Sequence, residues 1–120
     1  MILYLDASAI VKQYISEFGS TEIENAVTAA EANGTAVISR AEVIAAFAKA
    51  MRVGLLSETN ARTAIRNFNR NWPDLVRTRI TERLVQHAAI LALAHGLRGY
   101  DAIHVASAAA WQRLLLLSSV

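Results

Sequence analysis

The fold of this chain is decided by the stretch ILYLDASAIVKQYI, residues 2–15. Residues 2–5 are a short apolar run rich in strand formers, which predicts a buried strand. From residue 7 to residue 15 the apolar side chains recur at helical spacing, with Lys12 and Gln13 on the opposite face, which predicts a helix. Asp6 stands between the two. A charge at the edge of a core costs free energy unless something compensates it, so this carboxylate is a candidate functional group.

The rest of the chain continues the alternation of short strands and helices. Further strands are predicted at 36–38 and 75–80, and helices at 21–32, from 39 to a stop at Gly54, at 57–72, at 81–95 and at 101–114, before a final apolar stretch. Thr21 and Glu24 are read as a capping box, Ser57 and Thr81 as helix starts, and Asn33-Gly34 and Gly96 as helix stops. The strand at 75–80 alternates apolar and polar side chains, as at a sheet edge. This alternation favours a single α/β domain, residues 1–120, with a parallel sheet.

Composition limits the class of protein. The chain is 54% hydrophobic and 18% charged, which indicates a folded domain and suggests an additional buried surface, such as a subunit interface. The formal charge of +2 permits an anionic partner without demanding one. There is no cysteine, which excludes disulfides and fits a cytoplasmic location. The apolar segment 102–120 is interrupted by His104, Gln112 and Arg113, so no membrane-spanning run is expected.

Three carboxylates share an unusual position. Asp6 ends the first apolar run, Glu42 follows the predicted strand at 36–38, and Asp101 opens an apolar helix. In a parallel sheet, ligands bind outside the carboxyl ends of the strands, so all three can reach one rim. Their mutual repulsion would call for a cation, and Mg²⁺ or Mn²⁺ is the natural candidate. Ser8 is placed to hydrogen-bond a carboxylate or a metal-bound water there.

Each acid also has a purely structural interpretation. Glu42 stands three residues after Ser39 and would complete a capping box. Asp101 would stabilise a helix N-terminus through the helix macrodipole. For Asp6 this alternative is weaker, because Ser or Thr would cap equally well. Capping and metal binding are compatible, so both interpretations stay open at this point.

The histidines do not indicate a zinc site, because no H-E-x-x-H spacing and no cysteine is present. His104 lies three residues after Asp101, on the same helix face. A structural hydrogen bond is favoured over catalysis for this side chain. No glycine-rich phosphate loop is present either, so nucleotide hydrolysis has no support.

Three motifs resemble those of a known family. LYLDASAIVK at residues 3–12, SRAEV at 39–43 and LRGYDAIHVA at 97–106 are similar, in order and spacing, to the motifs of PIN-domain ribonucleases. Within that family the likeness is greatest to the VapC-type toxins of toxin–antitoxin pairs. The resemblance implies a three-layer α/β/α fold with a short parallel sheet flanked by helices.

The resemblance also implies an activity, which is metal-dependent endonucleolytic cleavage of RNA. By that analogy Asp6, Glu42 and Asp101 hold Mg²⁺ or Mn²⁺ and are the catalytic residues, with Ser8 in support. The ion would activate water and offset charge on the scissile phosphate. Cleavage of DNA instead of RNA is a weaker option.

The partners implied are an RNA substrate, a cognate antitoxin protein and a second copy of the chain, without a membrane. Lys12, Arg40 and Arg98 lie near the acidic motifs and are candidates for contacts with RNA phosphates. For each of them taken singly, a solvated surface charge is the better interpretation.

One departure from the family pattern concerns its fourth acidic motif. No acid follows Asp101, and the Leu-rich end of the sequence is expected to form a final strand. The chain is therefore expected to be truncated relative to the family, without the last acidic motif and the closing helix. This motivates an alternative function: a catalytically weak or inactive module that binds a protein partner or itself through apolar helices, including residues 43–51.

Overall fold

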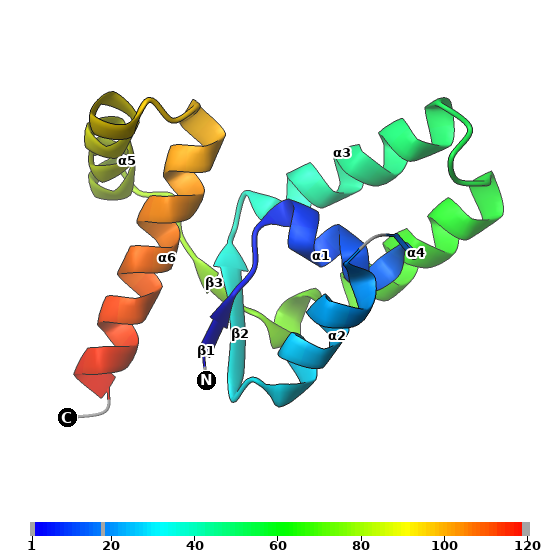
Figure 1. Ribbon diagram of the computed structural model, residues 1–120, viewed down its shortest axis with the longest axis horizontal. Helices are drawn as coiled ribbons and strands as arrows, with labels where there is room; N and C mark the ends of the chain where they lie inside the picture. The colour runs from blue at the N-terminus through cyan, green and yellow to red at the C-terminus, as the bar shows by residue number, and fades with distance from the viewer. Residues whose placement is uncertain (1, 18, 119–120) are drawn as a thin grey trace.

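A three-stranded parallel sheet runs through the middle of the computed structural model, which describes residues 2–17 and 19–118, with side chains for 3–17 and 19–111 (Figure 1). The strands are β1 (Ile2–Tyr4), β2 (Ala32–Ala36) and β3 (Val76–Thr78), in the order β1-β2-β3. Tyr4 pairs with Gly34, and Gly34 with Val76. The strand predicted at 75–80 is shorter in the structure, Val76–Thr78, and lies at an edge of the sheet, as the sequence indicated.

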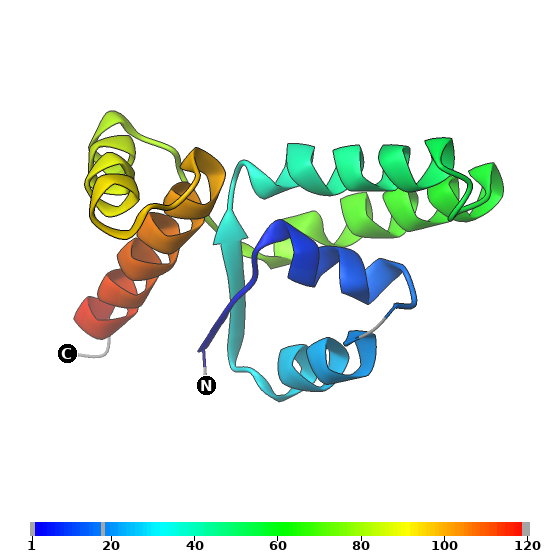
Figure 2. The same cartoon turned by 45° about the horizontal axis from the view of Figure 1, so that its top comes forward.

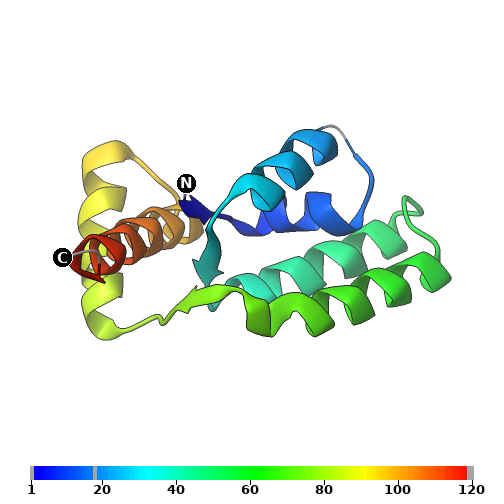
Figure 3. The ribbon, with the colours of Figure 1, turned by 90° about the horizontal axis from the view of Figure 1, so that it is seen from below.

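Helices cover both faces of this sheet, and Figure 3 separates the two groups. On one side lie α1 (Ala7–Tyr14), α2 (Ser20–Ala29), α3 (Ser39–Arg52) and α4 (Glu58–Asn71), with a 3-10 turn (Trp72–Asp74) leading to β3. On the other lie α5 (Glu82–His95) and α6 (Gly99–Ser118). Figure 2 shows α3 and α4 side by side. The predicted three-layer α/β/α architecture is confirmed.

Two separate clusters of buried side chains hold the layers together. The larger joins the end of β1 to α1, α3 and α4 and contains Leu5, Ile10, Val11, Val43, Phe47, Ala64, Phe68 and Trp72. The smaller lies between α5 and α6 and contains Leu84, Ala88, Ala102 and Ala106. Burial of apolar side chains on both sides is the main favourable term in folding. Within the described residues, 2–17 and 19–118, none of the helices is long and apolar enough to cross a membrane.

The packing of α6 on the sheet depends on a glycine in the central strand. A Cβ atom on Gly34 would lie 2.9 Å from Cε2 of Trp111, whose indole is buried. The Tyr4 ring lies beside the same indole, with 6.5 Å between ring centroids. A glycine inside a strand often marks such a close approach. Gly34 therefore allows α6 to lie close to β2.

The second strand is where the sequence-based prediction was wrong. It was expected at 36–38, with Asn33-Gly34 ending the preceding helix, but β2 is Ala32–Ala36 and α2 already ends at Ala29. Asn and Gly are poor strand formers, so local preference argued against this strand. Pairing with both neighbouring strands and contact with the indole outweigh that preference. The Thr21 capping box is also absent, because the N-cap of α2 is Gly19, with φ of 91°.

The final apolar stretch also differs from its prediction. It was expected to form a strand, but the backbone is helical in α6 through Ser118, and residues 119 and 120 lie outside the described residues. Leucine has a high helix propensity, and no glycine or proline interrupts residues 114–117. Other boundaries are confirmed: Ser57 and Thr81 cap α4 and α5 by accepting backbone N–H bonds, and Gly96 ends α5.

We expect Gly34→Ala to lower the free energy of unfolding by about 1–3 kcal/mol, because the new methyl group overpacks against a rigid indole. Urea denaturation measures the change. Gly99→Ala is the matched control, since a Cβ there meets nothing within 4 Å, and its unfolding free energy should not fall. Equal stability of Gly34→Ala and the wild type would contradict the close packing of α6 on β2.

Candidate functional site

The three acids singled out in the sequence line one pocket. Its volume is about 370 Å³, and its polar lining comes from Asp6, Ser8, Glu42, Arg98, Asp101 and His104. The pocket lies where β1 and β2 end and α1, α3 and α6 begin, which is the rim predicted for a ligand in a parallel sheet. Each acid stands at or near a helix N-terminus. The partial positive charge of those termini offsets part of the repulsion among the carboxylates.

Asp6 connects β1 to α1 and is the N-cap of that helix. Its Oδ1 accepts the Ala9 backbone N–H at 2.9 Å and the Ser8 hydroxyl at 3.0 Å. These two hydrogen bonds fix the orientation of a carboxylate that is otherwise exposed. The predicted bond from Ser8 to a carboxylate is therefore confirmed. Asp6 thus caps α1, and the capping hydrogen bonds hold its carboxylate in the pocket lining.

Glu42 lies in the first turn of α3 but does not form the capping box. The N-cap of α3 is Ile38, without a side-chain bond, and the hydroxyl of Ser39 is buried against that of Thr35 at 2.6 Å. The Glu42 carboxylate instead bonds across the pocket to the imidazole of His104, with 2.7 Å between Oε1 and Nε2. The capping interpretation of Glu42 was wrong, because Ser39 is used inside the core.

His104 makes a second hydrogen bond on its other side. Its Nδ1 lies 2.9 Å from the hydroxyl of Tyr4, so the ring joins a residue of β1 to a residue of α3. The predicted structural hydrogen bond of His104 is confirmed. Its partners, however, are Tyr4 and Glu42 rather than the neighbouring Asp101.

Asp101 lies in the first turn of α6, and its Oδ2 is 3.4 Å from Nε of Arg98, three residues earlier. Both side chains are mostly in solvent, with 55% and 90% of their surfaces exposed. An ion pair that exposed stabilises a protein by at most about 1 kcal/mol. The pair is therefore easily rearranged, and it places a guanidinium at the mouth of the pocket.

The three carboxylates share the pocket without forming a compact cluster. Among the residues with described side chains, no three acidic or histidine side chains lie together as a ready set of metal ligands. Each acid is held by a different partner: Asp6 by its own helix, Glu42 by His104 and Asp101 by Arg98. The pocket thus offers carboxylate oxygens that are oriented but spaced apart, beside the guanidinium of Arg98.

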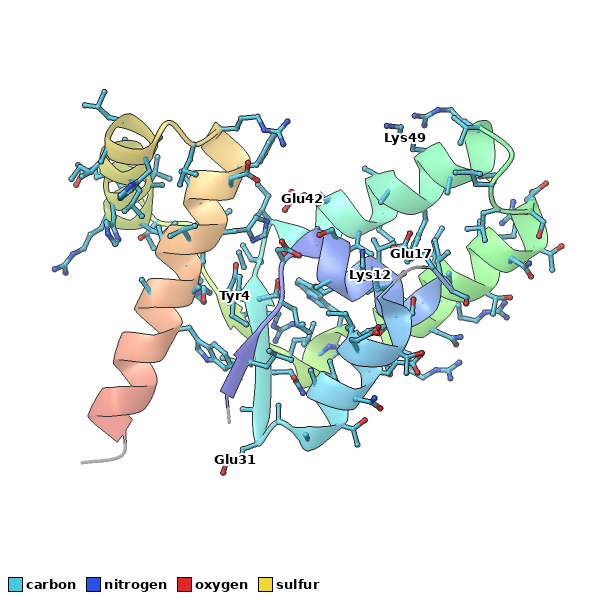
Figure 4. All side chains as sticks on the ribbon, viewed as in Figure 1. Tyr4, Lys12, Glu17, Glu31, Glu42 and Lys49 are labelled. Atoms are coloured by element: carbon cyan, nitrogen blue, oxygen red, sulfur yellow. The ribbon has the colours of Figure 1, made fainter. Side chains whose placement is uncertain are left out.

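The other two predicted RNA contacts lie outside the pocket lining. Lys12 pairs with Glu17 at 3.6 Å (Figure 4). The Arg40 guanidinium lies over the Trp72 ring, 5.8 Å from its centroid, and Arg77 approaches the same ring at 5.8 Å. Of the three cations predicted to contact RNA, the pocket includes Arg98. Contacts of Lys12 and Arg40 with RNA stay predictions.

Tyr4 is the residue that sequence reasoning missed. It was read as one more apolar position of a buried strand, although its hydroxyl requires a hydrogen-bonding partner when it is buried. Burial raises the pKa of Tyr4 to about 12, and the negative charges of Asp6 and Glu42 add to the effect. The phenol of Tyr4 is therefore neutral near pH 7. The one sequence signal was a tyrosine inside an otherwise aliphatic strand.

Comparison with known families gives one match that spans most of the chain. The sequence profile of the family described as PIN domain matches residues 3–116. This range includes all three carboxylates, Ser8 and His104.

Comparison with individual proteins gives relatives of the same kind. The chain is 38% identical over 109 residues to "Ribonuclease VapC45" of Mycobacterium tuberculosis strain CDC 1551 and to "Ribonuclease VapC49" of strain H37Rv. Each match covers 91% of this chain and 76% of the relative. "Ribonuclease VapC3" of Pyrobaculum aerophilum is 34% identical over 110 residues, which are 90% of this chain and 82% of that protein.

The raised pKa of Tyr4 predicts a loss of stability in alkali. Between about pH 10 and about pH 12 the unfolded chain ionises this phenol while the folded protein keeps it protonated, so unfolding becomes more favourable as pH rises. Urea denaturation across this range should give a shallower decline for Tyr4→Phe than for the wild type. In a spectrophotometric titration, the phenolate signal that appears near pH 12 in the wild type should be absent from Tyr4→Phe. The same slope in both proteins would disprove the shift.

Proposed function

The chain belongs to the PIN-domain family, and we propose that it is a metal-dependent endoribonuclease, the toxin of a toxin–antitoxin pair. One observation carries the proposal: Asp6, Glu42 and Asp101, from three separate motifs, line a single pocket at the carboxyl ends of the strands. The relatives reported above are each named a ribonuclease and cover most of the chain. Hydrolysis of RNA phosphodiester bonds is the reaction that suits both findings.

The donor set of the pocket suits Mg²⁺ or Mn²⁺. Carboxylate oxygens are the hard ligands that these ions prefer. Mg²⁺ retains several waters and is bound through one or two carboxylates, so it does not require three acids in direct contact. We propose that Asp6, Glu42 and Asp101 hold the ion directly or through water. A divalent ion supplies activation of water and neutralisation of charge on the scissile phosphate.

The side chains of the pocket have distinct roles in this proposal. Ser8 and the N-terminus of α1 keep the Asp6 carboxylate oriented. Arg98, largely in solvent at the mouth, exchanges its weak pairing with Asp101 for an RNA phosphate. The negative pocket alone would repel RNA, so both the ion and this guanidinium are needed to bring a phosphate close.

A second hollow extends the site along α3. Its volume is about 500 Å³, it shares Glu42 and Ala46 with the acidic pocket, and its lining includes Tyr100 and Lys49. The Tyr100 side chain is well exposed. Single-stranded RNA is bound by aromatic rings on which bases stack and by cations that contact its phosphates. We propose that the RNA strand leaves the acidic pocket along this hollow.

We also propose two protein partners. One is an antitoxin that silences the nuclease, and the other is a second copy of the chain, with which it forms a homodimer. Ile90 and Leu93 on α5 are exposed apolar side chains of the kind that such interfaces cover. Because the substrate is cellular RNA, we expect the protein to act in the cytoplasm.

A second candidate is a weak or inactive module that binds a protein partner. One observation favours it: no three acids among the described side chains form a ready metal cluster. Cleavage assays with Mg²⁺, Mn²⁺ or EDTA separate the candidates. Robust cleavage that requires a divalent ion rules out the inactive module, and a DNA substrate in parallel decides between RNA and DNA.

We expect Asp6→Asn to abolish RNA cleavage, because it removes a negative oxygen donor from the pocket. Asparagine still accepts the Ala9 and Ser8 hydrogen bonds through its carbonyl oxygen, so the fold should be retained. Cleavage of a labelled RNA and the circular dichroism spectrum measure the two properties. Asp74→Asn, an exposed acid of the 3-10 turn, is the matched control and should cleave normally. Undiminished cleavage by Asp6→Asn would remove Asp6 from the mechanism.

We expect Arg98→Ala to weaken RNA binding and to reduce the slope of log affinity against log salt by about 0.7, the value for one contact with a single-stranded phosphate. Fluorescence anisotropy at several salt concentrations gives both quantities. Arg62→Ala is the control, because Arg62 is also exposed and paired, with Glu58, but lies on α4 outside the pocket. An identical salt slope in the two variants would argue against a phosphate contact at Arg98.

A further inference from the structure

A chain of two hydrogen bonds crosses the molecule from β1 to α3 by way of α6. The Tyr4 hydroxyl lies 2.9 Å from His104 Nδ1, and His104 Nε2 lies 2.7 Å from Glu42 Oε1. Figure 4 labels the two ends, Tyr4 on β1 and Glu42 at the start of α3. The three residues belong to three elements and are separated by 100 and 62 positions in the sequence.

The positions of the protons in these two hydrogen bonds follow from the chemistry of the carboxylate, the imidazole and the phenol. An ionised carboxylate only accepts hydrogen bonds, so Nε2 of His104 must donate to Glu42. In a neutral ring Nδ1 is then the acceptor, and the neutral phenol of Tyr4 donates to it. In a protonated ring Nδ1 donates to the phenol oxygen. In either state the Nε2–H points at the carboxylate, so the orientation of the ring does not depend on its charge.

Packing restricts His104 further. Its side chain is 11% exposed, and the Tyr4 ring meets it edge-on, with 6.1 Å between ring centroids and 67° between planes. Glu42 is less confined, with 26% of its side chain exposed on the pocket. A glutamate has three rotatable side-chain torsions, and a partly exposed one samples several rotamers unless a partner holds it. The rigid member of the pair is therefore His104.

We propose that His104 is a positioning residue, which Tyr4 holds in place and which orients the Glu42 carboxylate to bind a divalent cation in the pocket. This inference rests on the proposed function, because it takes Glu42 to be one of the groups that hold the ion. Partners that hydrogen-bond a metal-binding carboxylate set its direction, and losing one typically lowers metal affinity by about 10–100-fold. His104 itself touches neither the ion nor the RNA in this proposal.

Two substitutions of similar polarity separate positioning from a general structural role. In His104→Gln the amide nitrogen reaches about as far as Nε2, so the bond to Glu42 is retained. In His104→Asn the shorter amide reaches about as far as Nδ1, so only the contact with Tyr4 is retained. Both variants lose the imidazole ring, so a purely structural role predicts similar losses in the two.

Direct titration with Mn²⁺, followed by electron paramagnetic resonance and without RNA, is the decisive measurement. We expect His104→Asn to bind Mn²⁺ about 10-fold more weakly than the wild type, and His104→Gln to stay within about 3-fold of it. Thermal unfolding should place the two variants close together. Equal Mn²⁺ affinities in the two variants would overturn the inference.

Tyr4→Phe tests the hydrogen bond between Tyr4 and His104. It should weaken Mn²⁺ binding in the wild-type background but not in His104→Gln, where the amide no longer depends on the phenol. Nitrogen-15 shifts of His104 should show the proton on Nε2. An equal effect of Tyr4→Phe in both backgrounds would overturn the role of Tyr4.

The outcomes also separate this inference from the proposed function. A wild-type protein that binds no Mn²⁺ refutes both, whereas normal wild-type binding with unaffected binding in His104→Asn refutes the positioning role alone.

Discussion

The end of β1 is tied to the end of β2 by two hydrogen bonds, and the candidate site depends on them. Leu5 N–H donates to the Gly34 carbonyl at 2.7 Å, and the Thr35 hydroxyl donates to the Leu5 carbonyl at 2.6 Å. Since the single hydroxyl proton of Thr35 is used there, the Ser39 hydroxyl must donate to Thr35 in turn. Both hydroxyl side chains are fully buried. This network fixes the start of α3 relative to the exit of β1, and so fixes Glu42 relative to Asp6.

The site combines groups from both helical layers. Asp6 and Glu42 come from the layer with the larger core, whereas Asp101 and His104 come from α6 in the other layer. The width of the pocket therefore depends on how α6 lies against the sheet. Contact of the Trp111 indole with Gly34 and the hydrogen bond between Tyr4 and His104 both set that placement. Packing in the core and geometry in the pocket are thus linked through one helix.

The electrostatics of the pocket explain how three carboxylates are tolerated there. Each lies at or near a helix N-terminus, where the macrodipole favours negative charge, and each has a hydrogen-bonding or cationic partner. The partners differ in strength: the bond from His104 to Glu42 is short and shielded, whereas the pair of Arg98 and Asp101 is long and in solvent. A substrate phosphate or a cation can displace the second far more readily than the first.

Much of this could be predicted from the sequence, because the signals were local. The apolar run before Asp6, the caps at Ser57 and Thr81 and the stop at Gly96 are short-range patterns, and the order of the three acidic motifs identified the family.

Local patterns could not reveal the contacts that are made across the fold. Ser39 looked like the partner of Glu42 in a capping box, yet its hydroxyl bonds to Thr35 and the carboxylate bonds to His104. The sequence by itself thus determined most of the helices, the fold class and the three acids as candidates, since these follow from patterns along the chain. Only the tertiary structure decided the position of β2 and the partners of Tyr4 and Glu42, because both depend on how α6 packs across the sheet.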